Sequence, residues 1–135
     1  ATHPGISATK RFAEQGLKPL VTTISTLNQA FLSASAKAAY VAPYVGRIED
    51  AGVNAYQLIA DIAAMYARHG ASTQIAAASI RTPEQAEAVL RAGAPIAVMQ
   101  YNVFQNLLHS DMTKNWIDRF EANWLKISRD LTAKE

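Results

Sequence analysis

Two short apolar segments in the middle of the chain each end in side chains that can bind an anion. Residues 39–48 lead into Arg47, and residues 76–83 contain Ser79 and Arg81. In a parallel strand–loop–helix unit, the polar residues that follow a strand lie at its carboxyl end, where α/β folds place their chemistry. Guanidinium groups donate paired hydrogen bonds to phosphate oxygens, and serine adds another donor. The two segments therefore predict a phosphate site on one rim, although a single arginine more often belongs to a surface ion pair.

The composition is that of one globular domain, expected to span residues 1–135. Half of the residues are apolar and only 18% are charged, which argues against disorder. The net charge of +2 and the scattered basic residues predict no nucleic-acid partner. The absence of cysteine excludes disulfides and thiol chemistry. No apolar run reaches the ~18 residues that span a bilayer, and residues 1–7 lack the features of a secretory signal, so we expect a cytoplasmic protein with no membrane partner.

The spacing of apolar residues predicts an alternation of helices and strands. Helices are expected over residues 5–15, 27–34, 52–69, 83–92, 102–109 and 113–128. Strands are expected over residues 19–24, 40–42, 73–78 and 95–99. Such alternation is typical of a parallel sheet with right-handed crossovers, so the expected fold class is α/β. Four strands form either a small doubly wound sheet or half of a TIM barrel, which normally needs ~250 residues, and the similarity between the units favours the half barrel.

These segments resemble the small transaldolase and fructose-6-phosphate aldolase family. The likeness begins near Gly16, includes residues 40–48 and 77–81, and covers nearly the whole chain. It continues in the shorter matches at residues 27–30, 92–94, 105–109 and 120–124. The family fold is a TIM barrel. The resemblance therefore implies a partial (half) TIM barrel that holds strands five to eight and the carboxyl-terminal helices.

The family's chemistry implies a Schiff base between a lysine and a ketose carbonyl, through which a carbon–carbon bond breaks or forms. That lysine lies in a Lys-(Ile/Val)-Pro phrase, which the alignment of Gly5 places just before Ala1. No lysine inside the chain is an obvious substitute, because a Schiff-base lysine needs burial or a neighbouring cation. The resemblance implies reversible aldol cleavage or dihydroxyacetone transfer on phosphorylated ketoses, with no cofactor and no metal.

The resemblance also gives roles to five residues near the predicted strand ends. Thr22 matches a family position that contacts the reacting substrate, although a β-branched residue also suits a strand. Tyr44 matches a tyrosine that helps a water to move protons in the aldolase branch, where transaldolases usually carry phenylalanine. Alternatively, its ring packs with the hydroxyl at a wet edge. Arg47, Ser79 and Arg81 resemble the family's phosphate cradle.

The other polar and aromatic candidates are interpreted as structural. Glu49 and Asp50 are expected to pair with Arg47 or to be solvated. The three histidines are too widely spaced to form a metal site. The last predicted helix carries an aromatic stripe that resembles the terminal-helix contact of the family's ring-shaped pentamers. Its members are Trp116, Phe120 and Trp124.

A half barrel leaves one sheet face and two strand edges uncovered. Unpaired edges invite association, and burying ~1,000 Å² of apolar surface is worth roughly 25 kcal/mol before association costs. We therefore expect a homo-oligomer or a complementary half-barrel chain as partner, with a sugar phosphate as ligand.

Three functional hypotheses remain open at this point. The first is half of an enzyme that is active only when the barrel is complete. The second is a non-catalytic truncated barrel that serves as a phosphate-binding or assembly module. The third is an α/β domain that shares the family's ancestry without its activity. The absent lysine favours the last two for this chain alone, and the retained rim residues favour the first.

Overall fold

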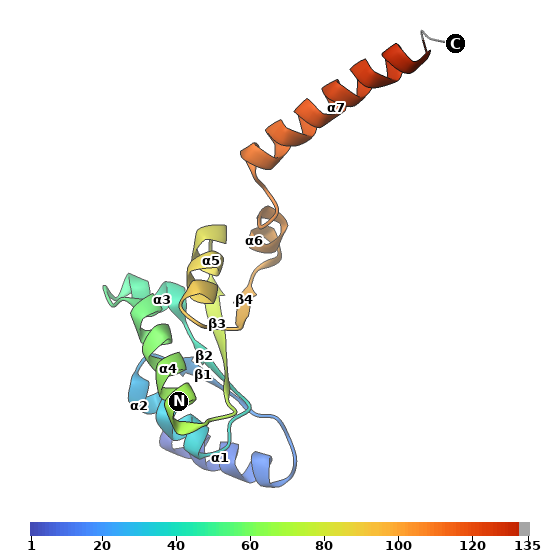
Figure 1. The fold of residues 1–135 in the computed structure, drawn as a ribbon. Helices are drawn as coiled ribbons and strands as arrows, with labels where there is room; N and C mark the ends of the chain where they lie inside the picture. Colours follow the sequence, from blue (N-terminus) through green and yellow to red (C-terminus); the bar gives the residue numbers. More distant parts are fainter. Residues whose placement is uncertain (133–135) are drawn as a thin grey trace. The chain divides into compact units, whose positions relative to one another are not determined.

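The computed structural model describes residues 1–132, except for the side chains of Asp130 and Thr132, and it divides into two units. The first unit is Ala1–Phe104, which holds the four strands of the sheet (Figure 1). The second is Gln105–Glu135, whose described part consists mainly of one long helix. The expectation of a single domain over the whole chain stays a prediction.

The elements alternate as the sequence predicts. The strands are β1 (Leu20–Ile24), β2 (Tyr40–Pro43), β3 (Gln74–Ile80) and β4 (Ile96–Met99). The helices are α1 (His3–Glu14), α2 (Leu27–Ser35), α3 (Val45–Asp50), α4 (Ala55–His69), α5 (Pro83–Arg91), α6 (Tyr101–Asn106) and α7 (Asp111–Thr132). Every expected segment is present, with bounds that differ by a few residues.

The short helix α3 is the element that the sequence pattern did not predict. It follows β2 directly, in a stretch where the apolar spacing predicted neither a helix nor a strand. The next helix, α4, begins at Ala55 because Asn54 caps it there, with its side-chain oxygen accepting from the Gln57 amide at 2.9 Å. The expected start of this helix at Gly52 is therefore wrong by three residues.

The sheet keeps the strand order β1-β2-β3-β4, and every neighbouring pair is parallel. Val41 pairs with Val21 on one side and with Ile75 on the other, and Ala77 pairs with Ala97. A doubly wound sheet reverses its strand order at a switch point. The sequential order excludes that alternative and confirms the expected partial TIM barrel.

Helices cover one face of the sheet and pack against alternate strand positions. The strands contribute these residues to the core: Val21, Ile24, Val41, Ile75, Ala77 and Ile80. The helices contribute residues that include Ala30, Ile59, Ile62 and Val89. On the opposite face, Leu20 and Val98 are each about half exposed, beside the small side chains of Ala42, Ala76 and Ala78. In a closed barrel this second face would line the interior.

The polar groups buried in the core are paired. The Tyr66 hydroxyl donates to the Ala30 carbonyl oxygen at 2.9 Å, and the Thr73 hydroxyl donates to the Ala38 carbonyl oxygen at 2.7 Å. Burial raises the pKa of the Tyr66 phenol. Within the described residues, every buried side-chain nitrogen or oxygen has a hydrogen-bond partner. The core is therefore a satisfied scaffold, and the groups open to ligand chemistry lie at its rim.

Candidate anion-binding and catalytic site

The carboxyl ends of β1, β2 and β3 bring the predicted site residues to one rim. The Thr22 hydroxyl donates to the Tyr44 hydroxyl at 2.8 Å. Arg47 lies over the Tyr44 ring, with its guanidinium carbon 5.5 Å from the ring centre. Tyr44 also forms an isolated parallel bridge with Ala78, the residue before Ser79. Tyr44 thus connects the hydroxyl on β1 to the polar residues that end β3.

Four of the five predicted residues line one cavity of about 600 Å³. They are Tyr44, Arg47, Ser79 and Arg81. The rest of the lining includes residues from β4 and the start of α6, namely Val98, Met99, Gln100, Asn102 and Val103. Two guanidinium groups and a hydroxyl around one cavity are a chemistry that suits a phosphate. Asn102 adds an amide that the sequence pattern did not single out.

β1 and β3 end in the same irregular backbone conformation. Thr23 has a φ of 57° and Ser79 a φ of 61°, in the left-handed region that residues other than glycine seldom adopt. At each position the register to the neighbouring strand shifts, which is the effect of one inserted residue. The next residue then returns to the core, since Ile24 is fully buried and Ile80 is 2% exposed. The insertion therefore lets a polar residue reach the rim while the isoleucine stays in the core.

The loops after these two strands repeat one hydrogen-bond pattern. Thr26 caps α2 by accepting from the Gln29 amide at 3.3 Å, and Thr82 caps α5 by accepting from the Gln85 amide at 3.2 Å. In return, each glutamine side chain accepts a 2.8 Å hydrogen bond from the backbone nitrogen just before the cap. The residues that donate it are equivalent in the two loops, Ser25 and Arg81.

Arg81 forms a bidentate ion pair with Asp50. Its two terminal nitrogens donate to the two carboxylate oxygens at 2.8 and 2.7 Å. These hydrogen bonds hold the pKa of Asp50 below its usual value, and the charges of Arg81 and Arg47 act in the same direction. The solvated alternative expected for Asp50 is confirmed, since its side chain is 59% exposed. Its pairing with Arg47 is wrong, because α3 packs against β3 and brings the carboxylate to the loop that carries Arg81. Glu49 instead accepts from the Ala55 amide at 2.7 Å.

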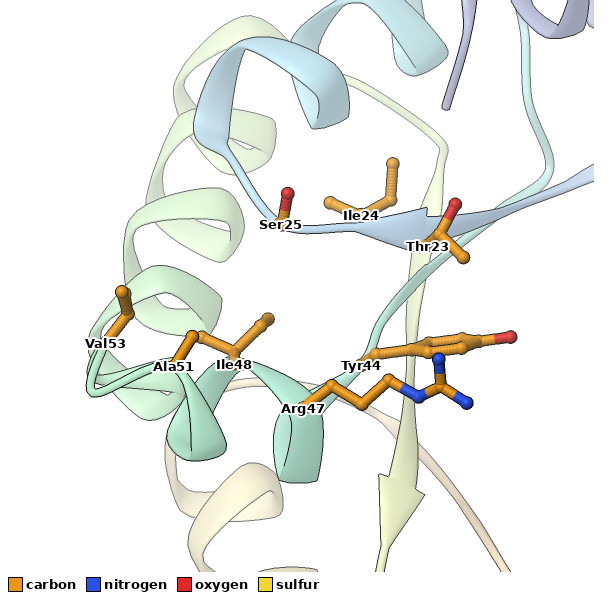
Figure 2. Close-up of a pocket in the computed structure, with 8 residues that line it drawn as sticks. All are labelled: Thr23, Ile24, Ser25, Tyr44, Arg47, Ile48, Ala51 and Val53. Atoms are coloured by element: carbon orange, nitrogen blue, oxygen red, sulfur yellow. The ribbon is translucent and has the colours of Figure 1, made fainter.

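A second cavity, of about 320 Å³, shares Tyr44 and Arg47 with the first. Thr23 and Ser25 bring hydroxyl groups to its lining, and the rest is apolar: Ile24, Ile48, Ala51 and Val53. Tyr44 and Arg47 extend side by side, away from Ala51 and Val53 (Figure 2). Arg47 makes no salt bridge with any residue in the described part of the chain, so its charge is available to a ligand.

The amino end of the chain lies at the same rim. The Ala1 nitrogen donates to the Thr22 carbonyl oxygen at 2.9 Å and to the Thr23 hydroxyl at 3.0 Å. The amino-terminal nitrogen therefore lies against the last residues of β1.

Comparison with known proteins identifies the family of this chain. The family model described as transaldolase/fructose-6-phosphate aldolase matches residues 1–134. The chain belongs to this family. The resemblance stated from the sequence is thereby confirmed.

Two curated relatives illustrate how much of the family's length is present. A probable transaldolase of Geobacillus sp. (strain WCH70) is 46% identical over 124 residues, and one of Lysinibacillus sphaericus (strain C3-41) is 42% identical over 125 residues. The matches cover 91% and 93% of this chain but 58% of each relative. The chain therefore spans little more than half the length of these family members.

A solved structure supports the fold independently. The crystal structure of a putative lactate oxidase from Pediococcus acidilactici matches 73% of this chain with a TM-score of 0.55. The match covers 27% of that protein, and the sequences are 22% identical. At this identity the likeness concerns the fold alone.

The remaining features of this family member lie outside the rim. The aromatic stripe is exposed on α7 within its own unit, at Trp116, Phe120 and Trp124, and its role as an oligomer contact stays a prediction. In the part of the chain that the structure describes, no three histidine or carboxylate side chains gather as a metal site would require. No described helix is both long and apolar enough to cross a bilayer.

Proposed function

We propose that the chain is the carboxyl-terminal part of a Schiff-base aldolase or transaldolase that acts on phosphorylated ketoses. The observation that carries this proposal is the convergence of a hydroxyl pair and two arginines on one rim of a family barrel segment. Thr22 and Tyr44 supply the hydroxyls, and Arg47 and Arg81 supply the positive charge. Membership of the transaldolase/fructose-6-phosphate aldolase family supports this chemistry at the rim.

The larger cavity is assigned to the phosphate end of the substrate. Arg47, Ser79 and Arg81 line it together, and each offers N–H or O–H donors but no negative charge. The unpaired charge of Arg47 attracts the dianion, and the fork of Arg81 fixes its orientation. A phosphorylated sugar is therefore a better fit to this cavity than a free one.

The reacting end is assigned to the neighbouring hydroxyls and to a lysine that precedes Ala1. The lysine amine adds to the ketose carbonyl and the carbonyl oxygen leaves as hydroxide, which gives an iminium. The iminium accepts the electron pair of the breaking carbon–carbon bond and becomes an enamine. The hydroxyl of the departing carbon gives its proton to that hydroxide, which becomes a water held by the hydrogen-bonded pair of Thr22 and Tyr44, and the departing fragment leaves as an aldehyde. The Ala1 nitrogen donates to the Thr22 carbonyl oxygen and the Thr23 hydroxyl, which supports a lysine joined there as the nucleophile.

A non-catalytic phosphate-binding or assembly module is the second candidate. The observation in its favour is that neither rim cavity has a lysine among its described lining residues. Such a module would keep the anion site of the larger cavity and lack the nucleophile.

Borohydride trapping separates the two candidates. Dihydroxyacetone or fructose 6-phosphate is incubated with the 135-residue chain, and with the same chain joined to the amino-terminal part of a curated relative. Borohydride reduces any iminium to a stable amine, which mass spectrometry detects. We expect an adduct on the joined protein, none on the chain alone, and none when borohydride is omitted. No adduct on either protein would exclude the enzyme and leave the binding module.

The expected partner and location belong to the same proposal. Leu20 and Val98 expose apolar surface on the open sheet face, which supports a complementary half-barrel chain or a second copy as its cover. A cytoplasmic location stays a prediction, as does the oligomeric state.

A further inference from the structure

The ion pair between Arg81 and Asp50 does not act mainly as a stabilising contact. Both side chains are at least half exposed, with exposed fractions of 50% and 59%. Exposed ion pairs contribute little to stability, because water screens their attraction. The geometry is nevertheless well defined, since each terminal nitrogen of the guanidinium donates to a different oxygen of the carboxylate. The effect of the pair is therefore to hold a long, flexible side chain in one orientation.

The loop itself has no need of this pair. The equivalent loop after β1 has the same positive φ, the same threonine cap and the same glutamine contact, with Ser25 at the position of Arg81. That loop forms without an arginine. Arg81 and Asp50 are therefore present for a reason other than the conformation of the loop.

Gly46 provides the space in which Arg81 lies. A Cβ atom added at Gly46 would stand 2.7 Å from Arg81 Nε, 2.9 Å from Arg81 Cζ and 2.7 Å from the Ser79 carbonyl oxygen. A Cβ atom essentially never lies closer than 3.0 Å to another heavy atom outside its own neighbourhood, so a side chain at Gly46 would force these groups to move. Glycine weakens a helix relative to alanine, yet Gly46 lies inside α3. The missing side chain is thus explained by the close approach of the guanidinium and the strained residue Ser79.

The arrangement leaves Arg81 with donors for a ligand. A guanidinium has five N–H groups, and Asp50 takes two of them. The others stay outside the ion pair, and Arg81 lines the larger cavity beside Ser79 and Arg47. A guanidinium held in place before the ligand arrives loses less conformational entropy when it binds.

We propose that Asp50 is a positioning residue that fixes the guanidinium of Arg81, in the space left by Gly46, so that the larger cavity selects the phosphate end of its substrate. This inference rests on the proposed function, because it names the device that orients the anion-binding group of that site. Asp50 acts through Arg81 and does not touch the phosphate itself.

Titration of the 135-residue chain with inorganic phosphate, by calorimetry at constant ionic strength, tests this role. Asp50→Asn should weaken phosphate binding about three- to tenfold, the cost of ordering one long side chain on binding. Asp50→Glu should restore part of the affinity. Glu87→Gln, which removes a carboxylate from an exposed ion pair with Arg91 away from the rim, is the matched control and should bind as the parent does. Gly46→Ala should weaken binding, because it displaces Arg81.

A double-variant cycle shows whether Asp50 acts through Arg81. In an Arg81→Gln background, Asp50→Asn should change phosphate affinity by less than about twofold, since coupled residues are not additive. Thermal unfolding of Asp50→Asn should match that of the parent, which separates positioning from a loss of structure.

The outcomes are distinguishable. Equal or tighter phosphate binding by Asp50→Asn, with Arg81→Gln still weakened, would overturn the positioning role alone and show that the carboxylate competes with the anion. An effect of Asp50→Asn that persists without Arg81 would also overturn it. If the parent binds no phosphate and Arg81→Gln changes nothing, the phosphate assignment in the proposed function falls together with this inference.

Discussion

The loops that follow β1 and β3 share one backbone conformation and differ in their chemistry. Both contain a residue with positive φ, both cap the next helix with threonine, and both use a glutamine side chain to accept from the same backbone nitrogen. That nitrogen belongs to Ser25 in the first loop and to Arg81 in the second. The first loop presents neutral hydroxyls beside Tyr44, whereas the second presents a guanidinium paired with a carboxylate.

This comparison shows how a barrel segment divides its tasks. The hydrogen bonds that build each loop involve the backbone nitrogen at position 25 or 81, so the side chain there is free to serve another purpose. Under the proposed function, hydroxyls at the end of β1 and after β2 help to move the proton, and the loop after β3 holds the anion. The predictions below either separate these two roles or test the backbone device that the loops share.

Tyr44→Phe should have the largest effect, and it should affect only the chemical step. The variant removes the hydroxyl that accepts from Thr22, so the rate of aldol cleavage by the barrel-completed protein should fall roughly 10²-fold or more. Phosphate affinity should stay within about twofold of the parent, because the other three cavity residues remain. The measurement is kcat with fructose 6-phosphate, beside a phosphate titration. An unchanged kcat would mean that Tyr44 only packs at the rim.

Truncation of the isoleucine that follows each inserted residue should destabilise the fold to a similar extent at both strands. Ile24 and Ile80 are both buried in the core, so Ile24→Ala and Ile80→Ala should each cost about 3 kcal/mol in free energy of unfolding. Leu20→Ala, at a half-exposed position of β1, should cost less than half as much. Urea unfolding measures all three. A large loss at only one isoleucine would show that the two strand ends are not equivalent.

Substitution at the equivalent positions Ser25 and Arg81 should affect anion binding in only one loop. Arg81→Gln should weaken phosphate binding about 10- to 100-fold, because hydrogen bonds to charged groups contribute about 1.5–3 kcal/mol. Ser25→Ala should leave phosphate affinity within about twofold. Calorimetric titration of both variants with inorganic phosphate gives the comparison. A comparable loss in Ser25→Ala would place the anion across both cavities.

Relief of backbone strain should have the smallest effect and the opposite sign. Thr23→Gly should stabilise the chain by about 1 kcal/mol and Ser79→Gly by less, because a β-branched residue is the more strained of the two at positive φ. Ala77→Gly, at a regular strand position, should instead destabilise by at least about 0.5 kcal/mol. Thermal unfolding reports the sign of each change. Destabilisation by Thr23→Gly would show that its hydrogen bonds outweigh the strain.

Much of the fold could be predicted because it depends on local pattern. Apolar spacing predicted every strand and every helix except α3, which has six residues and is too short to show a helical period. The sequence repeats isoleucine, threonine and glutamine at the same spacing after both strands, at Ile24, Thr26 and Gln29 and at Ile80, Thr82 and Gln85. This repeat could have shown that the two loops are equivalent, but apolar spacing alone does not include it.

The candidate site could be predicted only in part. Tyr44, Arg47, Ser79 and Arg81 were expected on one rim because parallel strands end at the same edge, and the structure places all four around one cavity. The partner of Asp50 was not predictable, because Arg81 lies 31 residues further along the chain. Only the packing of α3 against β3 brings the two side chains together.

The sequence by itself determined the alternation of elements, the buried faces of the strands and the types of residue that follow each strand. These properties follow from local propensity and apolar period, which each segment carries alone. Only the tertiary structure decided that the strands stay in sequential order, that Asp50 pairs with Arg81, and that Gly46 makes room for it. Those facts depend on how α3 packs against β3, a contact between segments that no local pattern encodes.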